Sequence, residues 1–121
     1  MGLIRIPSNN ETFRRPVTVT FPAPAGQEPA TAEFEVEYNR IDQPEIESWV
    51  EEGWYVTRIV DRMVRGVYGV DDGTGKEADP QTAKEMVLRS PECCTAVRNT
   101  FFDALGQTPP QKTSKKQRWR G

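Results

Sequence analysis

The chain contains no histidine, and this absence limits the chemistry available to it. Histidine is the side chain whose ordinary pKa lies closest to neutral pH, so the commonest general base is missing. Ser-His-Asp and Cys-His catalytic arrangements are therefore excluded. Zinc sites are also disfavoured, because histidine and cysteine are the usual zinc ligands. The composition predicts a protein that is not an enzyme and that binds no metal or cofactor.

Cysteine is nearly absent as well. The two cysteines, Cys93 and Cys94, are adjacent, and a disulfide between neighbours closes a strained ring. Two reduced thiols are typical of a cytosolic protein. Cys94 fits an apolar helical stripe and is expected in the core. Cys93 lies close to an expected helix N-terminus, where a thiolate is favoured, so a reactive thiol is the less favoured alternative.

Long apolar runs are missing too. No run approaches the roughly 18 apolar residues that a membrane span needs. The apolar start of the chain, residues 1–7, is too short for a secretory signal. The 121 residues suffice for one domain with a modest core. We therefore expect a single-domain cytosolic protein.

Charge is unevenly distributed, because the body of the chain is acidic and its last eleven residues are basic. Residues 1–110 hold 11 Lys and Arg against 18 Asp and Glu, a net charge of −7, whereas residues 111–121 hold five cations and no acid. The candidates for tail contacts with a partner or nucleic acid are Lys115, Lys116, Arg118, Trp119 and Arg120. The simpler interpretation is a disordered basic tail over residues 107–121, which has too few apolar residues to fold.

Two segments alternate in the manner of β-strands. In Phe13–Phe21 valines alternate with threonines, and in Thr31–Tyr38 three glutamates alternate with apolar residues. A proline- and glycine-rich segment separates them. One polar face on each strand predicts an antiparallel hairpin that packs its other face on helices. Residues 1–12, before the hairpin, are expected to be flexible.

Helical periodicity follows the hairpin. Asp42 is an expected N-cap, and apolar residues recur at helical spacing from Ile46 to Val67. This pattern predicts either one long helix or two helices joined near Gly53. Within it, the stretch at residues 60–67 is expected to remain helical until Gly66 ends it, and a polar reversal follows at residues 71–75.

Two further helix starts are marked by a capping residue followed by proline. They are Asp79-Pro80 and Ser90-Pro91, and Gly106 is a natural helix end. The expected fold is therefore α+β, with an antiparallel β-hairpin followed by three or four α-helices on one face of the small sheet. The domain covers residues 13–106.

The polar reversal superficially resembles two ligand sites. Gly73-Thr74-Gly75-Lys76 is similar to part of a phosphate loop, but Val70 stands where that loop needs its first glycine and Glu77 stands where it needs Ser or Thr. The acids around it lack the alternating spacing of an EF-hand calcium loop. These residues are therefore interpreted as turn and cap residues.

Several pieces of the chain, taken in order, resemble the tail assembly chaperones of long-tailed bacteriophages and their prophages. The pieces span residues 13–106. They are Phe13-Arg14-Arg15-Pro16-Val17-Thr18-Val19, Ala32-Glu33-Phe34-Glu35-Val36-Glu37-Tyr38, Val60-x-x-Met63-Val64-x-Gly66-Val67-Tyr68-Gly69-Val70-Asp71-Asp72, Met86-Val87-x-x-Ser90-Pro91 and Ala96-Val97-x-x-x-Phe101-Phe102-x-Ala104-Leu105. The signature tryptophan of the family is replaced here by Val67 or Tyr68.

The resemblance implies a non-enzymatic role in virion morphogenesis. Such chaperones coat the tape measure protein and keep it soluble until the tail tube protein polymerises around it. They often form homo-oligomers, and many are also made in a longer form by a programmed ribosomal frameshift, whose extension recruits the tail tube protein. The family implies action in the cytoplasm of the bacterial host and absence from the mature virion.

The apolar stripe of the central helical region is wider than one contact face needs. We therefore expect it either to fill a two-sided core or to leave side chains free for a partner. The candidates for partner binding are Trp49, Trp54, Tyr55, Val67 and Tyr68. Two alternative functions are a head–tail connector or tail-terminator subunit, and a small nucleic-acid-binding regulator that uses the basic tail.

Overall fold

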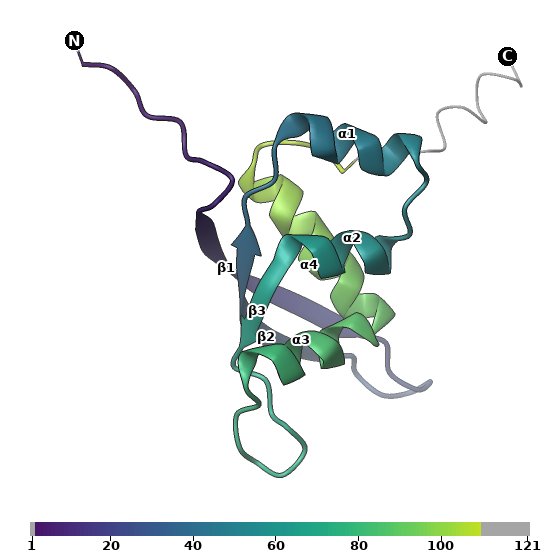
Figure 1. The fold of residues 1–121 in the computed structure, drawn as a ribbon. Coiled ribbons are helices and arrows are strands. Elements are labelled where there is room, and N and C mark those ends of the chain that lie inside the picture. Colours follow the sequence, from purple (N-terminus) through teal and green to yellow (C-terminus); the bar gives the residue numbers. More distant parts are fainter. Residues whose placement is uncertain (1, 110–121) are drawn as a thin grey trace, which may run out of the picture.

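The computed structural model describes residues 2–109, and these form an α+β fold. A three-stranded antiparallel sheet in the order β1-β2-β3 carries four helices on one face (Figure 1). The elements in chain order are β1 (Thr12–Phe21), β2 (Ala30–Asn39), α1 (Gln43–Glu51), α2 (Val56–Met63), β3 (Val64–Tyr68), α3 (Pro80–Leu88) and α4 (Pro91–Ala104). The predicted fold class is confirmed, with one strand more than the expected hairpin.

The hairpin of β1 and β2 has the predicted two-sided character. Val17 lies opposite Phe34, and both side chains are buried beneath the helices. On the other face a guanidinium nitrogen of Arg14 lies 2.8 Å from a carboxylate oxygen of Glu35. The alternation of the sequence therefore assigns the faces of the sheet correctly, because successive residues of a strand point to opposite sides.

The outer face of the sheet is held by hydrogen bonds to one carboxylate. The Thr12 hydroxyl donates to Glu37 Oε2 at 2.7 Å, and the Tyr68 hydroxyl donates to Glu37 Oε1 at 3.0 Å. The hydroxyl of Thr12 and, to a smaller degree, that of Tyr68 lower the pKa of Glu37 from its ordinary value. A single carboxylate thus connects all three strands.

Glu37→Gln should lower the free energy of unfolding by about 1 kcal/mol at pH 7, because an amide oxygen replaces only part of the carboxylate's acceptor capacity. A lowered folded-state pKa stabilises the fold above the unfolded value, 4.5, and this contribution is lost as the pH falls through the folded value. Urea unfolding midpoints of the wild type and the variant should therefore differ at pH 7 and converge as the pH falls below 4.5. A difference that stays constant with pH would contradict this role.

The prediction of helix for residues 64–66 is wrong. The sequence pattern predicts a helix that continues to Gly66, but α2 ends at Met63 and the chain continues as β3, antiparallel to β2. A register shift opposite Glu37 and Tyr38 makes a β-bulge in β3. Because a bulge inserts one residue, Val64 and Val67 both face the core although they are three residues apart. Their spacing therefore imitates that of a helix.

Gly66 permits a close contact between β3 and α3, and it does not end a helix. It is buried in β3, and a Cβ atom added there would lie 3.1 Å from Cβ of Pro80 in α3. In the same region Gln81 Nε2 donates to the backbone oxygen of Arg65 at 2.8 Å. The small residue therefore allows α3 to lie against β3, and α3 supplies a donor to this strand.

Local capping signals place the helices as predicted. Asp42 accepts from the backbone N–H of Glu45 at the start of α1, and Asp79 caps α3. The predicted break near Gly53 is present, since its φ of 71° is a left-handed conformation that ends α1 before α2 begins. Gly106 has a φ of 72° just after α4. These positions separate four short helices.

Ser90→Ala should lower the free energy of unfolding by about 1 kcal/mol, the usual effect of removing an N-cap. The Ser90 hydroxyl accepts from the backbone N–H of Cys93 at the start of α4, and alanine leaves this donor unpaired. Thermal unfolding measures the loss. Ser90→Thr is the matched control, because threonine retains a capping hydroxyl and should keep most of the wild-type stability.

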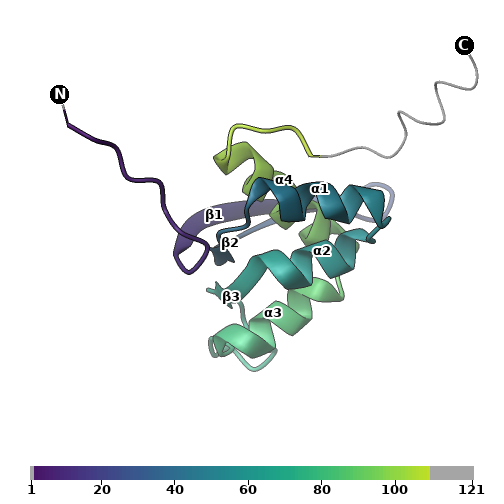
Figure 2. The same ribbon diagram turned by 45° about the horizontal axis from the view of Figure 1, so that its top comes forward.

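The core is centred on α4. Its Phe101 packs against Phe13 and Tyr38 of the sheet, with ring centroids 6.0 and 5.5 Å apart. The Tyr38 hydroxyl reaches the helix and donates to the backbone oxygen of Val97 at 2.8 Å. Desolvation by burial raises the pKa of Tyr38 well above its ordinary value. Residues 2–7, in contrast, lead away from this body without regular structure (Figures 1 and 2).

Candidate interaction surface

An aromatic corner forms where α1 gives way to α2. We define it as Trp49, Trp54, Tyr55 and Arg58. The left-handed Gly53 reverses the chain, and the backbone N–H of Trp54 donates to the Trp49 oxygen at 2.9 Å. This reversal stacks the two indole rings with centroids 5.9 Å apart. The aromatic corner is therefore built by the end of a helix rather than by one continuous helical face.

The outer layer of the aromatic corner is rigidly held. The Arg58 guanidinium lies 3.7 Å from the centroid of the Trp54 ring, and Trp54 Nε1 donates to Glu52 Oε1 at 3.0 Å. Tyr55 follows directly and is 84% exposed. A tyrosine ring left in water beside an ordered indole presents apolar area with little rotamer entropy to lose on binding. This arrangement suits contact with an apolar segment of another protein.

Two of the five predicted binding residues belong to the core. Trp49 is 1% exposed, and Val67 is completely buried against β2 and the helices. Their side chains support the fold and are not available to a partner on the surface. The reason is that α1 packs its apolar face inward and the β-bulge turns Val67 toward the helices.

The structure does not bring Tyr68 to the aromatic corner. Tyr68 ends β3, whereas Tyr55 precedes α2, so the two tyrosines stand at opposite ends of the α2–β3 segment. The Tyr68 ring lies on the outer face of the sheet under the Arg14 guanidinium, 4.0 Å from the ring centroid. Trp54 and Tyr55 therefore form one candidate surface, and Tyr68 belongs to another. The tail candidates Lys115, Lys116, Arg118, Trp119 and Arg120 lie outside the described residues.

A second apolar feature, which we call the apolar groove, opens between the hairpin and α3. It encloses about 430 Å³. Its lining residues are Phe21, Ala32, Glu33, Phe34, Gly69, Val70, Asp71, Met86, Val87, Ser90 and Cys93. Met86, one of its lining residues, is 37% exposed, and Asp71 adds one carboxylate to the otherwise largely apolar lining. Glu33 lines the groove next to Phe34, but its side chain points to the outer face of the sheet. The groove suits an apolar chain segment that carries a positive charge.

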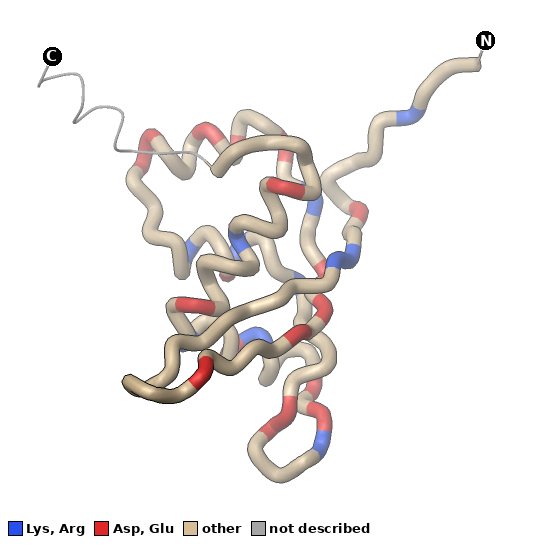
Figure 3. Tube along the Cα trace, turned by 180° about the vertical axis from the view of Figure 1, so that it is seen from behind, with Lys and Arg blue, Asp and Glu red and all other residues tan. Residues whose placement is uncertain are grey.

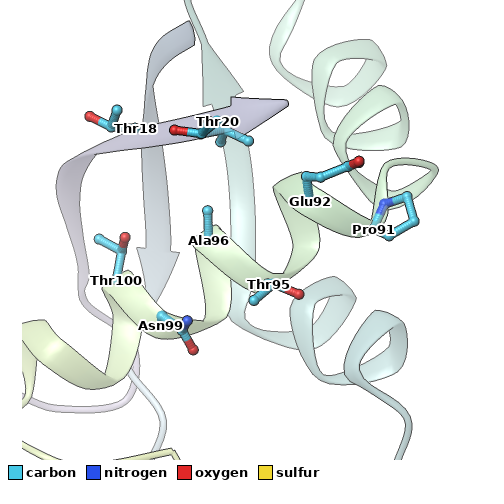
Figure 4. A pocket seen from close by; sticks show the side chains of 9 residues that line it. Thr18, Thr20, Pro91, Glu92, Thr95, Ala96, Asn99 and Thr100 are labelled. Atoms are coloured by element: carbon cyan, nitrogen blue, oxygen red, sulfur yellow. The ribbon is translucent and has the colours of Figure 1, made fainter. Parts of the chain in front are cut away.

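A hydroxyl-rich hollow, separate from the apolar groove, lies between β1 and α4 (Figure 4). It encloses about 630 Å³, and its lining includes four threonines, Asn99 and one acid, Glu92. The hollow offers hydrogen-bonding groups but only one ionisable side chain. A general acid–base pair needs two positioned groups, so these residues form no such pair.

Charge on the described surface is mainly negative. Acidic positions are spread over α1, β2 and the loop after β3 (Figure 3). In that loop Asp71 and Asp72 accept hydrogen bonds from backbone N–H groups of Gly73 and Thr74, as expected of turn residues. Among residues 2–109, no group of three or more His, Cys, Asp or Glu side chains is arranged to hold a metal ion.

Both thiols are buried and unbonded to each other. Cys94 belongs to the core as predicted, its Sγ lies 3.4 Å from the Val87 oxygen, and burial raises its pKa. Cys93 lies in the first turn of α4 and lines the apolar groove. The groove itself is not predicted by the sequence pattern, because its walls come from β1, β2 and α3.

The N-terminal apolar residues were also missed as an interaction feature. Leu3, Ile4 and Ile6 contact nothing that covers them and are 102%, 88% and 79% exposed. Three large aliphatic residues within four positions, in a segment outside any expected strand or helix, are the signal that identifies them. In residues 2–109 no helix is long and apolar enough to cross a bilayer.

The chain matches no protein-family model, and no curated protein or solved structure is significantly similar to it.

Proposed function

We propose that this protein is a tail assembly chaperone of a long-tailed bacteriophage or prophage. It binds the tape measure protein in the host cytoplasm and keeps it soluble, and a longer frameshifted form recruits the tail tube protein. The observation that carries the proposal is the ordered resemblance of five pieces of sequence between residues 13 and 106. Each piece alone is short, and their common order and spacing give the argument its weight.

Apolar surface on the described residues supports this function. Tape measure proteins are long and largely helical, and a helix without its partners exposes an apolar stripe that aggregates in water. Tyr55 and Trp54 of the aromatic corner offer aromatic area to such a stripe, and the acidic body around them keeps the complex soluble. The protein needs no catalytic group for this task.

Co-expression with the tape measure protein encoded by the same phage tests the proposal. We expect the soluble fraction of the tape measure protein to rise several-fold, and the two proteins to purify together. Phe101→Ala serves as the control for a chain that is made but not folded. An equally insoluble tape measure protein with and without the chaperone would overturn the proposal.

Purified virions distinguish this function from a structural one. A connector or tail-terminator subunit remains in the particle, whereas a chaperone leaves before the tail is complete. Mass spectrometry of purified virions should therefore detect the tape measure and tail tube proteins but not this chain. Its presence at a fixed stoichiometry would identify a structural subunit instead.

A further inference from the structure

Two features have no partner among residues 2–109, and they are complementary. The first is the N-terminal arm, which we define as residues 3–6. Its three aliphatic side chains are almost fully exposed, although burying each of them would be favourable. The only cation of the arm, Arg5, forms an ion pair with Glu11 at 2.7 Å. The arm is therefore an apolar segment with one positive charge.

The second feature is the apolar groove. Its walls are formed by aliphatic and aromatic side chains of the hairpin and α3 and by the segment that follows β3, and Asp71 contributes one carboxylate to the lining. Apolar walls attract aliphatic side chains, and the carboxylate of Asp71 favours a cation beside it. The arm supplies both, since Arg5 stands between Ile4 and Ile6.

The arm cannot fill the groove of its own chain. Its base is fixed near the start of β1, because the Ser8 backbone N–H donates to Glu11 Oε2 and Asn9 Nδ2 donates to Asp42 Oδ2. Phe21 of the groove lies at the other end of β1, about 30 Å along the strand. The four residues from Ser8 back to Ile4 span at most about 14 Å. The arm also leads away from the body (Figures 1 and 2).

We propose that the N-terminal arm of one copy of this chain occupies the apolar groove of a second copy. Ile4 and Ile6 enter the groove, and Arg5 exchanges Glu11 for Asp71. This exchange costs little, since the side chains of Arg5 and Glu11 are 72% and 37% exposed and a surface ion pair contributes little to stability. The contact is head-to-tail, because arm and groove are different surfaces of one subunit.

The purified full-length chain tests this contact without the tape measure protein, so the result does not depend on the proposed function. Sedimentation velocity over about 1 μM to 1 mM covers the range of small, weak interfaces. The wild type should gain mass with concentration. The double variant Ile4→Asp/Ile6→Asp should self-associate at least about tenfold more weakly, because it loses both apolar anchors. Tyr55→Asp, at the aromatic corner, should associate like the wild type.

A mixing experiment identifies the two surfaces as partners. Met86→Asp alters the groove rim and keeps the arm, whereas the arm variant keeps the groove. Each variant alone should remain a monomer, and an equal mixture should form a heterodimer that grows no further, because only one intact arm–groove pair remains. Thermal unfolding of both variants checks their fold, and Met86→Ala replaces Met86→Asp if the latter is unstable.

Three results would overturn the proposal. The first is a wild type that stays monomeric throughout the concentration range. The second is an arm variant that self-associates as strongly as the wild type. The third is a loss of tape measure binding in the groove variant with self-association intact, which would assign the groove to the client.

Discussion

Phe101→Ala is expected to lower the free energy of unfolding by about 3–5 kcal/mol. Phe101 is fully buried at the junction of the sheet and α4, where it contacts the rings of Phe13, Tyr38 and Phe102. Alanine removes the ring and leaves a cavity that the two aromatic neighbours on the sheet cannot fill without breaking their own stacking. Because a small domain has only about 5–15 kcal/mol of stability, much of the chain should unfold.

Urea unfolding followed by circular dichroism measures this loss. Tyr55→Ala is the matched control, since it also removes an aromatic ring but at a position that is 84% exposed. Its free energy of unfolding should stay within about 0.5 kcal/mol of the wild type. Equal losses in the two variants would mean that α4 is not the centre of the core.

Tyr55→Ala is also expected to have the largest effect on the proposed activity. Truncation of a central aromatic side chain in an interface commonly costs about 2 kcal/mol or more, which corresponds to roughly a thirtyfold weaker complex. The exposed ring of Tyr55 beside the ordered Trp54–Arg58 stack is the part of the aromatic corner that a client reaches first. The variant should therefore bind the tape measure protein weakly and fail to keep it soluble.

Binding of the purified variant to a soluble tape measure fragment, measured by titration calorimetry, checks this expectation. Tyr55→Phe keeps the ring and should retain most of the affinity, which separates an apolar contact from a hydroxyl-dependent one. Met86→Ala tests the groove in the same assay and should bind normally. Wild-type affinity of Tyr55→Ala would exclude the aromatic corner as the client surface.

Where the prediction from sequence failed, tertiary contacts determined the local structure and the periodicity of the sequence did not. Val60, Met63, Val64 and Val67 follow helical spacing, yet the last two belong to β3. Nothing in those residues distinguishes a helical stripe from a strand with a bulge, because both place apolar side chains three residues apart on one face. Pairing with β2 decides between them, and that pairing depends on residues far away in the sequence.

Tertiary contacts also decide which of the candidate binding residues are buried and which are exposed. The sequence pattern gathers Trp49, Trp54 and Tyr55 into one apolar group near Gly53. Only the turn at Gly53 and the packing of α1 bury the first of them and expose the last. The apolar groove was not predictable at all, since its walls come from segments more than 60 residues apart.

The sequence alone determined the class of the fold, the two-sided hairpin, and the starts of α1, α3 and α4. Strand alternation and capping are interactions between near neighbours along the chain, so they can be recognised without knowledge of the fold. Tertiary structure alone decided the third strand, the separation of core from surface aromatics, and the groove. These features depend on which distant residues pack together, and the free energy of such contacts is not encoded in any single segment.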